Sequence, residues 1–291
     1  MRVLTSCFRN QLFTKSLQIN VGYTDTIGME HHMIPSGDRH LSTSIDFPAE
    51  HGQTELRYPV VIITHGLTGQ RIGKSYHLVE FARRLNQIGI ACVRFDQSGC
   101  GESTGDFIDL TIPRMKNDLL AIRNWVRDQA WCDTKRMGYV GISLGALPTI
   151  AVDADHTSSG VVLWAPVYNM PRVFQQTAKS GLRAIMDMQG WVPFRGLRIG
   201  KGFIDHLNTI NPDALISKSS APILLIHSRA DDTSPIIESF NYRDTCKKVS
   251  RLCELIEFQT ADHDFSDYND RGKLLSHTLD FFQRQLAPII K

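Results

Sequence analysis

Short apolar runs alternate with amphipathic segments along the chain from residue 59 onward. The runs are rich in valine, isoleucine and leucine and are too short for buried helices, so they predict strands buried on both faces. Strands are predicted at 59–65, 90–96, 136–142, 160–166, 221–228 and 252–258, and helices at 76–88, 112–130, 144–155, 235–248 and 272–286. This alternation implies an α/β fold with a mostly parallel central sheet and helices on both faces.

The chain before residue 59 follows other patterns. Apolar and polar residues alternate in the segment 41–48, which predicts an antiparallel strand at one edge of the sheet. Residues 1–18 have no such pattern, and we expect a frayed or edge-packed N-terminus there. Neither an internal repeat nor a low-complexity linker divides the chain, so we expect residues 1–291 to form a single domain.

Residues 168–210 interrupt the alternation between two predicted strands. The segment contains large apolar side chains, among them Met170, Trp191, Phe194 and Phe203. This is more apolar surface than a simple crossover needs, so we expect a small cap over the carboxyl-terminal edge of the sheet, where ligands bind in this architecture. The alternative is an irregular helical crossover packed as part of the core.

The composition narrows the class of protein. The chain has 42% apolar and 21% charged residues, as a soluble globular protein does, and its net charge of +2 without clustered Lys or Arg argues against a nucleic-acid partner. No apolar run is long enough for a transmembrane segment. The six cysteines show neither the density of a disulfide framework nor a zinc-binding spacing. We therefore expect a cytoplasmic protein with reduced thiols and no metal; the pattern gives no signal for an oligomeric state.

One predicted strand ends in a serine that lies between two glycines. The segment Gly141-Ile142-Ser143-Leu144-Gly145 has the G-x-S-x-G spacing of a nucleophile elbow. Such a turn from strand to helix holds the serine at its apex, and each glycine leaves space that a side chain would block. Ser143 is therefore the candidate nucleophile.

A serine nucleophile needs a base and a group that orients the base. In an elbow fold the acid and then the histidine follow the nucleophile along the chain, each just after a strand. Asp231 and His263 have these positions and are the candidate acid and base. Asp232 is an equally placed acid, and Asp262 and Asp264 also lie near enough in sequence to crowd the site.

Acyl transfer also needs backbone donors for the oxyanion, each worth ~3 kcal/mol in the transition state. The N–H of Leu144, at the start of the helix, is one expected donor. The second is the N–H of Leu67, in the loop after the first parallel strand, where Gly66 permits close approach of the backbone to a substrate.

Other polar residues are expected to be structural. His65 and His227 end strands and are expected to brace loops. The glycine-rich segment 96–105 lacks the GK[ST] ending of a phosphate-binding loop, so we expect a tight loop tied together by Asp96 and Ser103.

From residue 59 to the C-terminus these motifs resemble the α/β-hydrolase superfamily. The motifs, in the order of that family, are HGLTG (65–69), FDQSGCGESTG (95–105), GISLG (141–145), IHSRADDTSP (226–235) and ADHDFSD (261–267). The set is similar to the small-cap esterases of the feruloyl/cinnamoyl type and to related lipases and acyl-transfer enzymes. The resemblance implies that Asp231 rather than Asp232 is the triad acid, that His263 is the base and that Leu67 supplies an oxyanion donor.

The chain departs from those esterases beside the nucleophile, where Ile142 replaces their usual histidine. We expect a serine hydrolase that cleaves a carboxylic ester or thioester through an acyl-enzyme, with no cofactor. The apolar cap suits a small-molecule substrate with an aryl or medium-length acyl group. The alternatives are acyl transfer on the same triad and a non-catalytic ligand-binding protein on a hydrolase fold. A peptidase is a weaker alternative, because we find no propeller or large accessory domain before the core.

Overall fold

The computed structural model describes residues 28–48, 56–156, 158–177 and 182–286. The frayed or edge-packed N-terminus expected over residues 1–18 lies outside the described residues. Its strands are β1 (Gly28–Ser36), β2 (Arg39–Phe47), β3 (Tyr58–Thr64), β4 (Ala91–Phe95), β5 (Cys132–Ile142), β6 (Gly160–Trp164), β7 (Trp191–Phe194), β8 (Leu197–Gly200), β9 (Ile223–Ser228) and β10 (Cys253–Phe258). Its α-helices are α1 (His77–Gln87), α2 (Ile112–Arg127), α3 (Ala146–Asp155), α4 (Met170–Thr177), α5 (Leu182–Gln189), α6 (Lys201–Asp205), α7 (Pro212–Leu215), α8 (Ile237–Lys248) and α9 (Tyr268–Gln285). Short 3₁₀ turns are η1 (Lys74–Tyr76), η2 (Phe107–Asp109), η3 (Ser143–Gly145) and η4 (Ile216–Lys218).

Eight of the described strands form one mixed sheet in the order β1-β2-β4-β3-β5-β6-β9-β10. In this sheet the strands β4, β3, β5, β6, β9 and β10 run parallel to one another. β1 pairs antiparallel with β2, and β2 pairs antiparallel with β4. This is the α/β-hydrolase fold that the alternating pattern and the motifs predict. Strands β3, β4, β6 and β9 and the second half of β5 are almost fully buried, which explains why the sequence shows them as continuous apolar runs.

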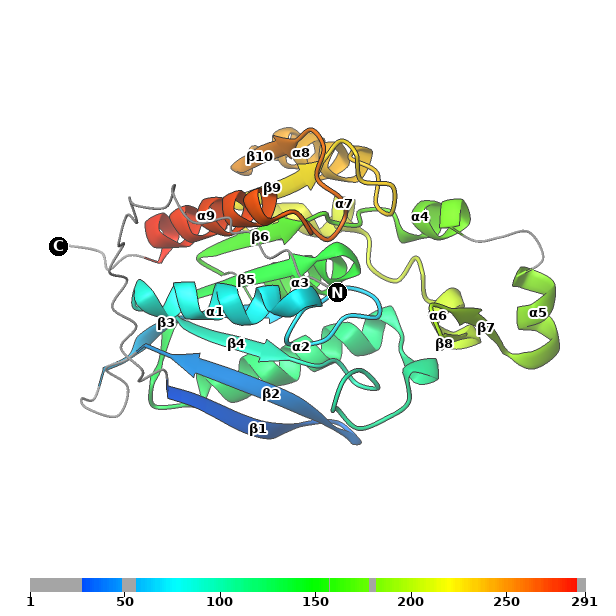
Figure 1. Cartoon of the computed structure of the whole chain (residues 1–291), viewed down its shortest axis with the longest axis horizontal. Coiled ribbons are helices and arrows are strands. Elements are labelled where there is room, and N and C mark those ends of the chain that lie inside the picture. Colours follow the sequence, from blue (N-terminus) through cyan, green and yellow to red (C-terminus); the bar gives the residue numbers. More distant parts are fainter. Residues whose placement is uncertain (1–27, 49–55, 157, 178–181, 287–291) are drawn as a thin grey trace, which may run out of the picture.

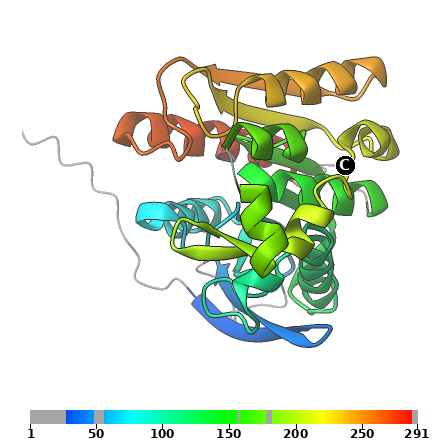
Figure 2. The ribbon, with the colours of Figure 1, turned by 90° about the vertical axis from the view of Figure 1, so that its right-hand side faces the viewer.

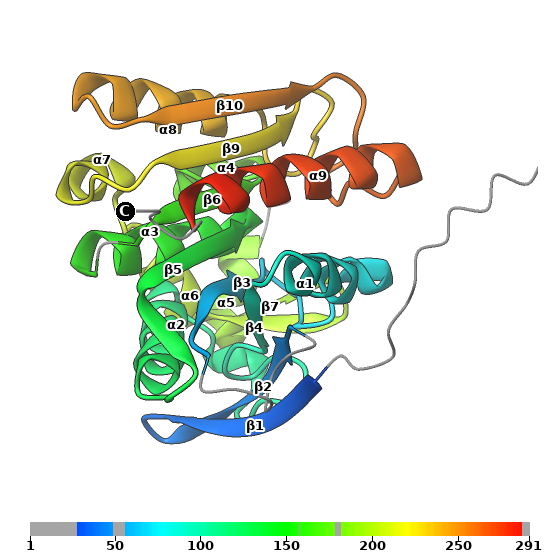
Figure 3. The same ribbon diagram turned by 90° about the vertical axis from the view of Figure 1, so that its left-hand side faces the viewer.

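Helices cover both faces of the sheet, as Figure 3 shows with the sheet seen nearly edge-on. On one face α1 and α9 pack over β3 to β9 through side chains such as Phe81 and Phe282. On the other face α2, α3 and α8 contribute Leu119, Ile150 and Tyr242 to a second cluster. The parallel strands therefore end together at one edge of a rigid, two-sided core.

The prediction of an antiparallel strand at 41–48 is correct, but its position at the edge of the sheet is wrong. β2 pairs with β4 on one side and with β1 on the other, so β1 is the edge strand. Most of the β1 side chains are exposed, and Ile34 and Ser36 are its buried residues. An edge strand with so few buried residues has no apolar pattern for sequence analysis to detect.

The described residues of the segment 168–210, predicted to be a cap, lie beyond the carboxyl ends of the parallel strands (Figures 1 and 2). It contains α4, α5, α6 and the antiparallel hairpin β7–β8, which the sequence did not predict. Buried residues of the segment, including Val192 and Phe203, share a hydrophobic cluster with Leu144 and Leu147 beside the elbow. The segment thus packs directly over the end of β5.

Two contacts fix this segment to the core. At its start, the fully buried carboxylate of Glu238 accepts hydrogen bonds from the backbone N–H groups of Tyr168 and Asn169, at 2.8 and 2.6 Å, and pairs with Arg172. At the end of the hairpin, a Cβ atom on Gly200 would lie 2.2 Å from the carbonyl oxygen of Ile108, so only glycine fits this approach to η2.

Candidate active site

Ser143 lies at the turn between β5 and α3, in a left-handed backbone conformation with φ of 52°. An L-residue costs roughly 1–2 kcal/mol in this region because Cβ approaches the following carbonyl oxygen. A strained serine at the end of a buried strand matches the nucleophile elbow predicted from the G-x-S-x-G motif. The turn directs the hydroxyl away from the sheet and into a cavity.

The two motif glycines are required by close approach of the backbone. A Cβ atom on Gly141 would lie 2.8 Å from Cα of Ala146, and one on Gly145 would lie 2.4 Å from the carbonyl oxygen of Thr64. Both distances are too short for a side chain. The glycines therefore let α3 start against the end of β3, which sets the position of the serine.

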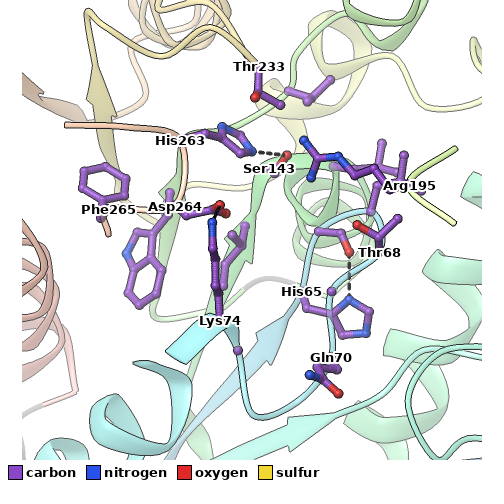
Figure 4. Close-up of a pocket in the computed structure, with 18 of the residues that line it drawn as sticks. His65, Thr68, Gln70, Lys74, Ser143, Arg195, Thr233, His263, Asp264 and Phe265 are labelled. Carbon is purple, nitrogen blue, oxygen red and sulfur yellow. Dashed lines mark hydrogen bonds and ion pairs between the residues drawn. The ribbon is translucent and has the colours of Figure 1, made fainter. Parts of the chain in front are cut away.

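His263 and Asp231 complete a hydrogen-bonded chain with the serine. The hydroxyl of Ser143 lies 3.1 Å from His263 Nε2, and His263 Nδ1 lies 2.7 Å from Asp231 Oδ2 (Figure 4). In the neutral imidazole this network assigns the proton to Nδ1, so that Nε2 is free to accept the serine proton. The structure thus brings together the three residues selected from the sequence, with the geometry of a nucleophile, a base and an orienting acid.

The carboxylate of Asp231 is held by more than His263. Its Oδ1 accepts hydrogen bonds from the backbone N–H groups of Thr233 and Ser234, at 2.9 and 2.8 Å. Burial by itself raises the pKa of Asp231, but the hydrogen bonds from His227 and His263 outweigh burial and hold this pKa well below its ordinary value. The carboxylate is therefore ionised and oriented at neutral pH.

The other nearby acids make different contacts. Asp232 is exposed and interacts with the Thr233 hydroxyl at 3.3 Å. Asp262 Oδ1 accepts a hydrogen bond from the N–H of Ser266, and Asp264 pairs with Lys74 Nζ at 2.5 Å. Within the described residues, none of these three acids forms a hydrogen bond or an ion pair with the imidazole of His263.

His227 supports the acid, a role that its position at the end of a strand did not reveal. Its Nε2–H lies 2.7 Å from the carbonyl oxygen of Ser234 and 3.2 Å from Asp231 Oδ2, while its Nδ1 accepts from the hydroxyl of Ser239 at 2.7 Å. The ring is fully buried and bridges β9 to the loop that follows it. The sequence-based expectation that His227 braces a loop is correct, and the loop it braces carries Asp231.

His65 and Gln97 anchor the loop that carries Leu67. The Nδ1–H of His65 donates to the carbonyl oxygen of Gly66 at 2.8 Å, its Nε2 accepts from the N–H of Gln97 at 3.1 Å, and the Gln97 amide donates to the carbonyl oxygen of His65 at 2.8 Å. Burial lowers the pKa of His65, so the ring stays neutral and Nε2 keeps its lone pair for the acceptor role. The loop position is thereby fixed against β4.

The predicted oxyanion donors lie beside the serine. A Cβ atom on Gly66 would lie 3.0 Å from Cβ of Ser143, so the 65–69 loop passes directly against the nucleophile. Leu67 and Leu144 both line the cavity, and Leu144 lies in the first turn after β5, where backbone N–H groups have no intrahelical acceptor. The role of these two N–H groups stays a prediction.

The cavity over Ser143 has a volume of about 380 Å³, within the range of small-molecule sites. Loops at the strand ends form its floor, and the segment 168–210 forms the opposite wall (Figure 4). Apolar groups dominate the lining, and those from the 168–210 segment are Met170, Val173, Phe194 and Ile199. Such a site can hold an apolar acyl or aryl group against the serine.

The glycine-rich segment 96–105 forms the tight loop expected from the sequence. Asp96 Oδ2 accepts from the N–H of Glu102 at 3.0 Å, and the hydroxyl of Ser103 donates to the carbonyl oxygen of Asp96 at 2.6 Å. Asp96 also pairs with Arg71 and accepts from its backbone N–H. The loop therefore stabilises the β4 end of the site.

Three further observations concern only the part of the chain that the structure describes. No group of three or more His, Cys, Asp or Glu side chains there could hold a metal ion. No helix among the described residues is long and apolar enough to cross a membrane. The described cysteines, at positions 92, 100, 132, 246 and 253, are free thiols.

Comparison with known proteins points to one family. The sequence profile of the prolyl oligopeptidase family matches residues 82–288, more than half of the chain. Among curated proteins, an uncharacterized 31.7 kDa Escherichia coli protein is 32% identical over 108 residues, which are 37% of each chain. An uncharacterized Mycobacterium tuberculosis protein is 27% identical over 177 residues, or 61% of this chain and 54% of that one. The chain therefore spans about one third of the Escherichia coli relative and about half of the Mycobacterium tuberculosis relative.

Solved structures share the fold at low sequence identity. Est1E from Butyrivibrio proteoclasticus with bound ferulic acid has a TM-score of 0.76 at 21% identity, covering 89% of this chain and 100% of that one. A Pyrococcus furiosus esterase has a TM-score of 0.67 at 20% identity, with 90% and 92% covered. A Pyrococcus horikoshii acylaminoacyl peptidase has a TM-score of 0.70 at 19% identity, with 92% and 43% covered.

Proposed function

This chain belongs to the prolyl oligopeptidase family of serine hydrolases, and from that premise we propose that it cleaves carboxylic esters through an acyl-enzyme on Ser143. The observation that carries the proposal is the hydrogen-bonded chain from Ser143 through His263 to Asp231, which opens into an apolar cavity of about 380 Å³. The similar structures with this fold include an esterase and a peptidase. The choice between an ester and an amide substrate therefore rests on the chemistry of the site and on a direct kinetic comparison.

In acylation, His263 Nε2 takes the proton of Ser143 as Oγ bonds to the substrate carbonyl carbon. The carbonyl oxygen becomes an oxyanion, toward which the N–H groups of Leu67 and Leu144 are proposed to donate. The intermediate collapses as its bond to the alcohol oxygen breaks, and the proton on Nε2 passes to that oxygen. Throughout, the ionised carboxylate of Asp231 holds the imidazole and stabilises its positive charge.

In deacylation, a water molecule takes the place of the alcohol. His263 Nε2 removes its proton, the hydroxide oxygen bonds to the acyl carbon, and the bond to Ser143 Oγ breaks as Oγ regains a proton. The carboxylic acid then leaves. Transfer to an alcohol or thiol acceptor would use the same residues, and only the access of water to the acyl-enzyme would differ.

The apolar lining favours a small ester. A cavity of this size, floored by strand-end loops and walled by the 168–210 segment, holds one aryl or medium-length acyl group. Est1E binds ferulic acid in a structure with the same fold, which supports an aryl or acyl ligand here. A thioester with the same acyl group would fit equally.

A peptidase is the second candidate, and membership of the prolyl oligopeptidase family favours it. The two activities differ in the leaving group, because an amine must be protonated as it departs and an amide bond is harder to break than an activated ester. A direct comparison therefore uses p-nitrophenyl hexanoate and N-acetyl-alanine p-nitroanilide with the same enzyme preparation.

The experiment that tests the proposal begins with a fluorophosphonate probe and mass spectrometry of the labelled peptide. We expect label on Ser143, hydrolysis of the hexanoate ester and loss of both in Ser143→Ala, whose thermal unfolding should stay close to that of the original protein. Faster turnover of the anilide than of the ester would replace the esterase proposal with the peptidase. A folded protein that takes no label and turns over neither substrate would point instead to a non-catalytic binding protein.

A further inference from the structure

Arg195 is a cation in the cavity that the catalytic chemistry does not use. It lies at the tip of the β7–β8 hairpin and lines the cavity together with Ser143 and His263. Figure 4 shows its guanidinium directed toward the serine, with His263 on the other side of Ser143. The guanidinium carbon lies 5.5 Å from the centroid of the Phe194 ring, in a cation–π contact.

The other charges around the cavity cancel or are absent. Lys74 Nζ pairs with Asp264 Oδ2 at 2.5 Å. Asp264 is the acidic residue among the described residues that line the cavity. Burial lowers the pKa values of His65 and His77, so both rings are neutral at pH 7. Among the described residues no carboxylate forms an ion pair with Arg195. The resting cavity therefore carries one unbalanced positive charge at the wall opposite the strand ends.

The backbone at the tip conflicts with local preference. Phe194 pairs with Leu197, so Arg195 and Gly196 form a two-residue turn, with φ of 49° and 82°. A turn with both central residues at positive φ favours Asn-Gly or Gly-Gly, because a long side chain is disfavoured in the left-handed region. A local rule broken at a cavity-lining position is characteristic of a functional residue.

The second arginine of the hairpin provides a contrast. Arg198 pairs with Asp106 at 3.0 Å and lies 5.9 Å from the Trp191 ring, and it does not line the cavity. Its charge is balanced by the neighbouring loop and contributes to holding the hairpin against the core. The two arginines share an element and a residue type but face different surroundings.

We propose that Arg195 binds an anionic group, such as a carboxylate, at the far end of the acyl part of the substrate. The acyl part is the relevant one because the leaving group must depart toward His263, which donates the proton, and Arg195 lies on the opposite side of the serine (Figure 4). The substrate class is then an ester of an acid with an apolar body and a second acidic group. This inference rests on the proposed ester hydrolysis.

The test compares two esters of matched length, p-nitrophenyl hexanoate and the mono-p-nitrophenyl ester of adipic acid, by kcat/KM at pH 7 and low salt. The readout is the ratio of adipate to hexanoate turnover. Arg195 is exposed, and an exposed pair of a guanidinium and a carboxylate is worth about two- to fivefold, so the ratio should fall by about that factor in Arg195→Gln. Arg195→Lys should retain part of the preference because the charge remains without the bidentate geometry.

Arg198→Gln is the matched control, and the ratio should not change in it. Arg195→Glu should lower the ratio further and should favour the ester of 6-aminohexanoic acid, whose terminal group is cationic. Thermal unfolding identifies any variant that has lost its fold, and the ratio corrects for loss of active enzyme.

The outcomes separate the two proposals. A ratio that is the same in Arg195→Gln and the original protein, including an equal loss on both esters, overturns the role of Arg195 and leaves the ester hydrolase in place. A ratio that falls equally in Arg198→Gln also overturns it. Turnover of neither ester by the original protein overturns the proposed function, and the inference about Arg195 with it.

Discussion

His227 Nε2 lies 3.2 Å from Asp231 Oδ2, the same oxygen that accepts the hydrogen bond from the candidate base. Two imidazoles therefore share one carboxylate oxygen, and the buried ring is the one tied to β9 and α8. The acid is thus oriented from two sides, and the second side depends on a residue that has no part in proton transfer.

Replacing that buried ring should weaken catalysis without removing a triad member. In His227→Leu we expect kcat/KM for an ester to fall about 10-fold and the free energy of unfolding to fall by about 1–3 kcal/mol, because Ser234 and Ser239 lose their partner. Ester kinetics and urea denaturation measure the two effects. His277→Leu, on α9 and without a hydrogen bond to the triad, is the matched control and should keep its activity. Equal effects in both variants would contradict a role for His227 in positioning.

The two adjacent aspartates should separate clearly by substitution. Asp231→Asn removes the negative charge beside His263 and allows the wrong tautomer, so kcat should fall by roughly 10⁴-fold. Asp232→Asn changes an exposed group and should stay within about twofold. Steady-state kinetics on p-nitrophenyl hexanoate with both variants at equal folded concentration decides between them; the opposite order of effects would transfer the role of the acid to Asp232.

Gly145 should tolerate no side chain. Its added Cβ would meet the carbonyl oxygen of Thr64 at 2.4 Å, so Gly145→Ala should lower the free energy of unfolding by about 1–3 kcal/mol and displace the nucleophile. Gly272 in α9 has open space around it and should gain about 0.5–1 kcal/mol on the same substitution. Denaturant unfolding of the two single variants tests the contrast, and similar destabilisation of both would show that the close approach does not matter.

Acid should destabilise the protein through His65. Its pKa is lowered in the folded state, so below the unfolded value of about 6.5 the unfolded chain binds a proton that the folded chain excludes. Stability is therefore present at neutral pH and is lost as the pH falls from about 7 toward 5. The midpoint of thermal unfolding should decline over that interval, and the decline should be smaller in His65→Asn, whose side chain does not titrate. An identical slope in this variant would assign the pH dependence to other groups.

The sequence predicts the parallel core well because its strands are buried on both faces and read as apolar runs. The same burial logic misses β1, whose side chains are mostly exposed, and the β7–β8 hairpin, whose strands are too short for a pattern and whose Arg195-Gly196 turn lacks the usual Asn-Gly. The sequence also misses the start of β5, which begins at Cys132 rather than at residue 136. The first residues of this strand are mostly polar and therefore give no apolar run.

The candidate site shows a similar division. Motif spacing identifies Ser143 and His263 as candidates, because each must follow a buried strand and lie at the carboxyl-terminal edge of the sheet. The residues alone could not choose between Asp231 and Asp232, because the choice depends on a turn in which the N–H groups of Thr233 and Ser234 draw one carboxylate inward. Support from His227 and the position of Arg195 depend on packing between distant segments, which spacing along the chain does not record.

The left-handed backbone at Ser143 has a consequence for how this protein would respond to selection. Glycine adopts φ of 52° without the steric cost that serine bears, so Ser143→Gly should unfold at a higher temperature than Ser143→Ala by the equivalent of about 1 kcal/mol. Thermal resistance and turnover therefore depend on the same dihedral angle in opposite ways. A population of variants screened for heat tolerance alone would accumulate inactive proteins at this position.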